Sequence, residues 1–514
     1  MDAIGKGIFV NKRNKLLVYN SVITIFMQIV TMVCGLILPR AILSAFGSDV
    51  NGLVNSIVQF LSFITLLDGG LGGVIRAAYY KPLADNNTES ISEIFATSNK
   101  FYRQIASVFV VYLFLLAFLF PVFSKEQFEY LYTFSLVLVI SLVTLMQYYL
   151  GQTLKLLVFS DQHGYIHNIT QIITTIVNTV LSVILINLNA GIHLVKLVAA
   201  ITYLIQPIIL SVYVKKHYNL DFKAKPSKYA ISQRWDALAR HIAFYIHSNT
   251  DIAILTVFTN FATVSVYSVY KIVVNGLTNL VAGIIGNTEA TFGNMLASSD
   301  KDKFDDEFRT VDVISKIIST SCFSTCSILI CRFVLIYTHG VNDADYYRPL
   351  FAIFLCASEW IYCLGLTYNN VIVSVGHFKQ TTSIGIIEAT INILLSIIFV
   401  FYFGITGVVV ATVLAMTFKL IANVIYMRKN IYKVKLSFVF KSIISQMITV
   451  VICYCISMFL LPEISDYLGF VVVAIPTFFG SLFVSVVMNM VFCHRETIIV
   501  INRFACRLRI KKEN

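Results

Sequence analysis

Apolar runs about as long as a bilayer is thick recur through almost the whole chain, and they constrain its fold more than any other feature. A helix needs about 20 predominantly apolar residues to cross the hydrocarbon core. Of the 514 residues, 57% are hydrophobic and 13% are charged, and the mean hydropathy is +0.79. Soluble globular domains do not have this composition. We therefore predict an all-α, polytopic membrane protein.

Hydropathy, together with the polar residues and the Gly and Pro residues between apolar runs, predicts about fourteen transmembrane helices. The first follows a basic N-terminus, and we interpret it as an uncleaved span because it is too long for the core of a signal peptide. The predicted spans are 16–39, 53–74, 104–123, 130–150, 164–187, 191–214, 238–258, 262–289, 311–337, 347–373, 380–402, 405–427, 438–461 and 468–493.

Basic residues gather on one side of this predicted topology. The N-terminus, the loops after even-numbered spans and the C-terminus hold about 29 Lys and Arg, whereas the other loops hold only Arg40, Lys125 and Arg348. Both termini are therefore predicted to be cytoplasmic. The net charge of +12 is explained by these loops, which can also contact anionic lipid headgroups, and we expect no nucleic-acid partner.

Three stretches of the chain match later stretches at an offset of 213 or 214 residues. QIITTIVNTVLSVILI (171–186) aligns with GIIEATINILLSIIFV (385–400), and KPLADNNTESISEIF (81–95) aligns with NMLASSDKDKFDDEF (294–308). The third match pairs VYVKKHY (212–218) with IYMRKNI (425–431). Helices one to six and seven to twelve are therefore predicted to be homologous halves.

Because each half holds an even number of spans, the two repeats are predicted to be parallel, with a central cleft suited to alternating access. We predict a six-helix bundle at 1–214, a cytoplasmic linker at 215–237, a second six-helix bundle at 238–427, and two peripheral helices with a basic cytoplasmic tail at 428–514.

The stretch FITLLDGGLGGVIRAAYY (63–80) places Asp68 in an apolar span, with Arg76 about 12 Å further along a continuous helix. An ionised group there costs several kcal/mol unless it faces protein or water. Two interpretations stay open. Asp68 caps a neighbouring helix while Arg76 reaches the cytoplasmic headgroups, or both residues line the inner mouth of the cleft.

Five further ionisable residues lie inside predicted spans of the second half, and they do not recur symmetrically in the first half: Asp251, Lys271, Glu359, Glu388 and Lys419. Asp251 and Lys271 are candidates for an ion pair between adjacent helices, as are Glu388 and Lys419. The alternative is that these groups enclose a watery path. Arg40, at the outer end of the first span, is a weaker candidate, since long cations near helix ends extend to the headgroups.

Two blocks carry a resemblance to a known family. LPRAILSAFGSDVNGLVNSIVQFLSFITLLDGGLG (38–72) and TDIAILTVFTNFATVSVYSVYKIVVNGL (250–277) resemble segments of the Wzx-like flippases, the polysaccharide transporter family of the multidrug/oligosaccharidyl-lipid/polysaccharide exporter superfamily. The span count and the repeated halves are also similar to that family.

The resemblance implies a MATE-like fold and transport of an undecaprenyl-pyrophosphate-linked oligosaccharide from the cytoplasmic to the outer leaflet, for O-antigen or capsule synthesis. It implies a bacterial inner-membrane location and partnership with a polysaccharide polymerase and a chain-length regulator. With that cargo, we expect the cavity cations to be Arg76, Lys271, Lys419 and Arg40. The expected coupling carboxylates are Asp68, Asp251, Glu359 and Glu388, acting with H⁺ or Na⁺. We expect no cofactor and no resident metal.

Three alternatives compete with this function. A multidrug antiporter of the same superfamily would share the fold but usually has twelve spans. A lipid II flippase would also have fourteen, but its N-terminal pattern is not evident. A membrane-embedded polysaccharide polymerase needs a large extracytoplasmic loop, and the predicted outer loops are short; no nucleotide-binding loop or nucleophile motif stands out. We therefore expect a transporter and not an enzyme.

Overall fold

The computed structural model describes residues 2–68, 71–124, 126–226, 249–286, 288–297 and 301–510, and within these ranges all regular structure is helical. The chain forms two compact units, Met1–Tyr245 and Ile246–Asn514, called here the N-terminal and C-terminal units. The predicted linker 215–237 lies within the described residues only as far as 226, and residues 238–248 of the predicted seventh span lie outside them.

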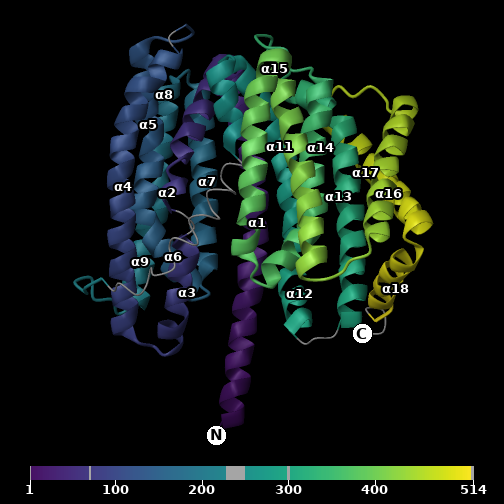
Figure 1. The fold of residues 1–514 in the computed structure, drawn as a ribbon. Helices are drawn as coiled ribbons and strands as arrows, with labels where there is room; N and C mark the ends of the chain where they lie inside the picture. The colour runs from purple at the N-terminus through teal and green to yellow at the C-terminus, as the bar shows by residue number, and fades with distance from the viewer. Residues whose placement is uncertain are drawn as a thin grey trace. The chain divides into compact units, whose positions relative to one another are not determined.

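In the N-terminal unit, α4, α5 and α8 pack side by side, and α1 packs along α7 (Figure 1). The helices are α1 (Asp2–Ser62), α2 (Thr65–Asp68), α3 (Leu71–Ala84), α4 (Thr88–Ser124), α5 (Tyr130–Met146), the π-helical turn η1 (Gln147–Gly151), α6 (Gln152–Ser160), α7 (Gly164–Asn187), α8 (Ile192–Tyr203) and α9 (Ile205–His217).

In the C-terminal unit, α13 is central and packs against α11, α14, α16 and α17. A short helix (Asn249–Phe258) is followed by α11 (Phe261–Gly286), α12 (Thr288–Ala297), α13 (Lys301–Tyr337), α14 (Pro349–Ser374), α15 (Phe378–Asn430), α16 (Leu436–Leu460), α17 (Tyr467–Phe492) and α18 (His494–Ile510).

The described residues account for the predicted spans. Eleven helices are long and apolar enough to cross a membrane. Two of these, Tyr19–Asp68 with 50 residues and Lys379–Asn430 with 52, are each broken by one glycine, Gly47 (φ 81°) and Gly404 (φ 56°). Each of these two long helices therefore corresponds to two predicted spans. The short helix Asn249–Phe258 is the described part of the predicted seventh span, 238–258. The all-helical membrane fold expected from the sequence is confirmed.

The expected repeat is visible in the helix boundaries. Both α4 and α13 are 37 residues long, and they start and end at the sequence offset of 213. The start of α7 at Gly164 corresponds to the start of α15 at Phe378. One segment departs from the repeat: α5 continues into α6 through the π-helical turn η1, whereas α14 is α-helical throughout.

The surface of α4 shows why these residues form a membrane helix. Its buried side chains, including Tyr102, Ile105, Phe109 and Leu113, recur every three or four residues. The opposite face is also apolar and exposed, with Val111, Phe114, Leu115, Phe118 and Leu119 between 49% and 63% exposed. A contiguous apolar surface of this kind suits lipid and not water.

The basic tail predicted after the last span is helical, as α18. Two ion pairs hold its first turn against α13: Arg309 with Glu496, whose atoms lie 3.3 Å apart, and Arg495 with Asp306, at 3.1 Å. Hydropathy does not reveal this helix, because the residues that pair with its first turn lie almost 190 residues earlier in the chain.

The start of the connection between the units is tied to the turn between α6 and α7. The Tyr218 hydroxyl donates to Asp161 Oδ2 at 2.7 Å, and His163 Nδ1 lies 3.1 Å from the same oxygen. Burial opposes ionisation of Asp161, but the hydrogen bonds from His163 and Tyr218 outweigh it and hold the pKa of that carboxyl below its usual value. The ionised carboxylate therefore stabilises this turn at neutral pH.

The break in α15 generates a prediction. Gly404 has φ 56° and ψ −135°, a conformation open essentially to glycine alone, and a Cβ at Gly407 would collide with the backbone carbonyl of Phe399. We expect Gly404→Ala and Gly407→Ala each to destabilise the protein by about 1–3 kcal/mol, measured as a lower unfolding temperature in detergent. Gly283→Ala is the matched control, because nothing lies within 4 Å of the added methyl. Equal stability of all three variants would contradict the prediction.

Candidate functional site

Asp251 lies in a network of neutral polar groups in the C-terminal unit. The side chain is 8% exposed. The Tyr267 hydroxyl donates to its Oδ2 at 2.7 Å, and the Thr412 hydroxyl lies 3.5 Å from its Oδ1. Asn392 Nδ2 donates to Thr412 at 3.0 Å, and the Thr250 hydroxyl donates to Asn392 Oδ1 at 3.2 Å. The short helix, α11 and both halves of α15 thus bring one carboxylate and several neutral oxygens together.

Lys271 of α11 pairs with Glu359 of α14, and not with Asp251 as the sequence analysis considered. Lys271 Nζ lies 2.7 Å from Glu359 Oε1, and the two side chains are 17% and 11% exposed. The Thr278 hydroxyl lies 3.2 Å from Glu359 Oε2. Asp251 is near enough to Lys271 for their charges to interact. The Tyr267 hydroxyl donates to Asp251, and the ion pair of Lys271 is made with Glu359.

The second ion pair considered from the sequence is present. Lys419 Nζ lies 3.2 Å from Glu388 Oε2, joining the two halves of α15 across the break at Gly404. Glu388 is fully buried, whereas the Lys419 side chain is 24% exposed. The lysine therefore reaches the edge of the unit while its carboxylate partner does not.

A third ion pair was missed. Lys316 and Asp312 are one helical turn apart on α13, and Lys316 Nζ lies 2.6 Å from Asp312 Oδ2. Both side chains are fully buried. Lys316 also donates to the Tyr368 hydroxyl at 3.2 Å and lies over the Tyr368 ring, 5.3 Å from its centroid. The Asp-x-x-x-Lys spacing inside the predicted span 311–337 was the available signal.

In the N-terminal unit, Asp68 ends α2 and accepts a hydrogen bond from the Tyr102 hydroxyl of α4 at 3.0 Å. Arg76 is exposed on α3. Lys155 of α6 is near enough to both residues for their charges to interact. The predicted spans leave Lys155 in a cytoplasmic loop, whereas η1 and α6 extend the fourth span ten residues beyond its predicted end.

The remaining predicted site residue, Arg40, lies partly buried in α1, seven residues before the break at Gly47, and its backbone carbonyl accepts from Ser44 at 2.9 Å. The predicted cavity cations and the predicted coupling carboxylates therefore do not form two separate clusters. They lie in several local arrangements, most of which contain both a cation and a carboxylate. Their roles as cavity cations and coupling carboxylates remain predictions. The described residues hold no cluster of three or more His, Cys, Asp or Glu able to bind a metal ion.

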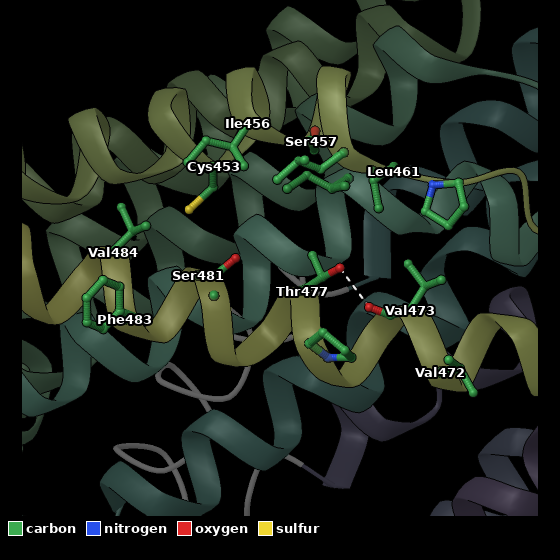
Figure 2. Close-up of a pocket in the computed structure, with 15 residues that line it drawn as sticks. Cys453, Ile456, Ser457, Leu461, Val472, Val473, Thr477, Ser481, Phe483 and Val484 are labelled. Carbon is green, nitrogen blue, oxygen red and sulfur yellow. Dashed lines mark hydrogen bonds between the residues drawn. The ribbon is translucent and has the colours of Figure 1, made fainter.

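Figure 2 shows an apolar groove of about 560 Å³ between α13, α16 and α17, which lie in the C-terminal unit. Cys453, Ile456 and Ser457 come from α16, and Val473, Thr477 and Ser481 come from α17 (Figure 2). The Thr477 hydroxyl is satisfied by the Val473 carbonyl at 2.7 Å. The polar atoms of the groove are therefore few, and its walls match lipid chains in polarity.

The helical architecture, with its broken spans and buried charged groups, is the fold of transporters of the MATE and MurJ type. A structure of the lipid II flippase MurJ in an inward closed conformation has a TM-score of 0.71 at 13% identity, covering 94% of this chain and all of that one. An inward-facing multidrug resistance MATE family transporter of the MOP superfamily has a TM-score of 0.62 at 12% identity, covering 78% of this chain and 95% of that one.

A third solved structure, the MATE multidrug transporter DinF-BH, has a TM-score of 0.59 at 16% identity and covers 82% of this chain and 97% of that one. No protein-family model and no curated protein sequence matches the chain. These similarities establish the fold. The N-terminal pattern of lipid II flippases is not evident in this sequence, yet the chain shares the fold of a lipid II flippase structure.

The buried pair in α13 generates a prediction. Removing one partner of a buried ion pair leaves an uncompensated charge and costs about 3–5 kcal/mol, while replacing both partners is far less costly. We expect Lys316→Met to lower the stability by about that amount, and Lys316→Met combined with Asp312→Asn to recover most of it. Thermal unfolding of the purified variants measures both effects. Additive losses in the double variant would show that the two residues are not coupled.

Proposed function

We propose that this protein is a flippase that moves an undecaprenyl-pyrophosphate-linked oligosaccharide from the cytoplasmic to the outer leaflet of a bacterial inner membrane by alternating access. The observation that carries the proposal is the extent of the structural likeness. The lipid II flippase structure covers 94% of this chain, whereas the two MATE structures cover 78% and 82%. The chain has two long apolar helices, α16 and α17, after the repeated halves.

The proposed cargo has a charged diphosphate, polar sugars and an apolar tail, and both units contain groups of the matching chemistry. We retain Arg76, Lys271, Lys419 and Arg40 as proposed cavity cations. Lys271 and Lys419 are each paired with a carboxylate. Each would have to exchange that carboxylate for a cargo phosphate during the cycle.

We further propose that Asp251 couples transport to an ion gradient, with Asp68, Glu359 and Glu388 as the other proposed coupling groups. The hydroxyl and amide oxygens around Asp251 are ligands of the kind that hard cations such as Na⁺ prefer. The alternative coupling ion is H⁺, taken up by the buried carboxylate itself. A polysaccharide polymerase and a chain-length regulator are the proposed protein partners.

The cargo is tested by reconstituting the protein in proteoliposomes with a fluorescent undecaprenyl-pyrophosphate-linked oligosaccharide and, separately, with ethidium. A flippase makes the lipid-linked glycan accessible to a quencher outside the vesicles and leaves ethidium untransported. Transport of ethidium without movement of the glycan lipid would instead support the multidrug antiporter, the runner-up function.

If Asp251 couples transport to an ion gradient, Asp251→Asn should abolish the acceleration of transport by an imposed Na⁺ or H⁺ gradient. The transport rate without a gradient should stay the same. Thr412→Val should do the same for a Na⁺ gradient but not for a proton gradient, because it removes an oxygen ligand and leaves the carboxylate. Thr477→Val is the control, because the Thr477 hydroxyl donates to the Val473 carbonyl of its own helix, α17. Full gradient response in Asp251→Asn would exclude Asp251 as the coupling group.

A further inference from the structure

A groove in the N-terminal unit lies between α4 and the end of α5, two helices that pack side by side (Figure 1). Its volume is about 330 Å³, and it is lined by Ser107 and Val110 of α4 and, on the other side, by Met146, Tyr149 and Leu150. Tyr149 and Leu150 are 48% and 41% exposed. The walls are almost wholly apolar, so the groove matches a hydrocarbon chain better than it matches water.

The π-helical turn η1 forms part of one wall of this groove. Within the turn, Tyr148 is buried, whereas Tyr149 and Leu150 lie at the surface. Such π turns inside α-helices are frequent at functional sites. The corresponding helix of the C-terminal unit, α14, is α-helical throughout. The repeated fold therefore does not require this wall of the groove.

A cation lies at one end of the groove. The Arg103 guanidinium lies over the Tyr149 ring, 5.1 Å from its centroid. The Ser107 hydroxyl, which lines the groove, donates to the Arg103 carbonyl at 3.0 Å. Arg103 is exposed and comes directly before the predicted span 104–123. Arg and Tyr side chains at the end of a span lie at the level of the lipid headgroups.

The repeat shows how the equivalent cation of the C-terminal unit is compensated. Arg103 corresponds to Lys316 at the offset of 213 that relates α4 to α13, and Lys316 likewise lies over a tyrosine ring, that of Tyr368, at 5.3 Å. Lys316 pairs with Asp312, whose counterpart on α4 is the neutral Asn99. None of the ion pairs in the part of the chain that the structure describes includes Arg103. The helix α4 therefore keeps the cation and lacks its carboxylate.

The two cations also differ in what covers them. The Phe438 ring of α16 lies 5.9 Å from Lys316 Nζ, and both α16 and α17 pack against α13. Within the described residues of the N-terminal unit no helix follows α9, so α4 has no counterpart of α16 there. Beyond the groove, the same face of α4 continues with Val111, Phe114 and Leu115, which are between 49% and 63% exposed. An apolar face of this kind is covered by lipid where α13 is covered by protein.

We propose that this groove binds an anionic phospholipid of the surrounding membrane, with the lipid phosphate on Arg103 and one acyl chain between α4 and η1. A guanidinium binds a phosphate through two parallel hydrogen bonds, and the Tyr149 ring holds the guanidinium at the mouth of the groove. One cation matches the single negative charge of a phospholipid such as phosphatidylglycerol. The site involves none of the proposed cargo or coupling residues, so it does not depend on the proposed function.

The test is photo-crosslinking of the full-length protein in phosphatidylcholine nanodiscs that contain a small fraction of phosphatidylglycerol with a diazirine on one acyl chain. Mass spectrometry should find the label on peptides from 103–118 and 145–150, and phosphatidylcholine with the same diazirine should label them much less. Arg103→Met should reduce this labelling by phosphatidylglycerol roughly tenfold, as expected for loss of one charge-assisted contact. Ser107→Phe should also reduce it, because the larger side chain fills the groove and leaves the cation in place.

Two matched variants are the controls. Lys100→Met removes an exposed cation about one turn earlier on α4, and Val111→Phe adds an aromatic ring on the same face of α4 but outside the groove. Both variants should leave the labelling unchanged. Equal labelling by the two phospholipids, or losses in the controls as large as those in Arg103→Met and Ser107→Phe, would show that the groove holds only unselected boundary lipid and would overturn the proposal.

Competition separates the membrane phospholipid from the proposed cargo lipid. Unlabelled phosphatidylglycerol and unlabelled undecaprenyl pyrophosphate are added separately at the same mole fraction, and only the first should reduce the labelling. Displacement by undecaprenyl pyrophosphate alone would assign the groove to the polyprenyl lipid and overturn the proposal. Labelling that follows the predicted variant pattern, without any movement of the lipid-linked oligosaccharide in the transport assay, would leave the phospholipid site standing and refute the flippase.

Discussion

Charge compensation among apolar helices is the constraint on which the rest of this structure depends. A charge in the membrane interior is costly unless it is paired or faces water. The C-terminal unit meets this requirement by pairing, most completely at Lys316 and Asp312, where both side chains are fully buried. The pairs made by Lys271, Lys316 and Lys419 lie on α11, α13, α14 and α15, and two of these three join separate spans, so they specify which helices face each other as well as neutralising charge.

The helix count could be predicted from hydropathy because each span must satisfy its own backbone hydrogen bonds, which ties span length to bilayer thickness. The predicted ends of the span at 164–187 agree with α7. Prediction from hydropathy failed where helices extend beyond the apolar part of a span. Hydropathy predicts a loop at Lys155 because no hydropathy rule detects the π-helical turn η1. It predicts a tail in place of α18 because the ion pairs that hold α18 involve residues of α13, far away in the sequence.

Pairing of charges was the least predictable part of the candidate site. Lys271 is closer in sequence to Asp251 than to Glu359, yet it pairs with Glu359. Asp251 instead accepts a hydrogen bond from the Tyr267 hydroxyl, a neutral partner. A sequence shows which charges must be compensated, but the choice among partners depends on side-chain directions that arise only when the helices pack.

The repeat shows how one fold yields two electrostatic environments. In the C-terminal unit, α13 supplies the lysine and the carboxylate, and α14 supplies Tyr368. In the N-terminal unit, the corresponding helices exchange these types: α4 supplies Tyr102 and α6 supplies Lys155, while the carboxylate comes from α2. Because Asp68 is on a different element from Lys155, its attraction can be lost when the helices shift, whereas Asp312 and Lys316 are one turn apart on a single helix and stay together. The relation between Asp68 and Lys155 thus depends on how two elements pack, whereas the Asp312–Lys316 pair is fixed within α13.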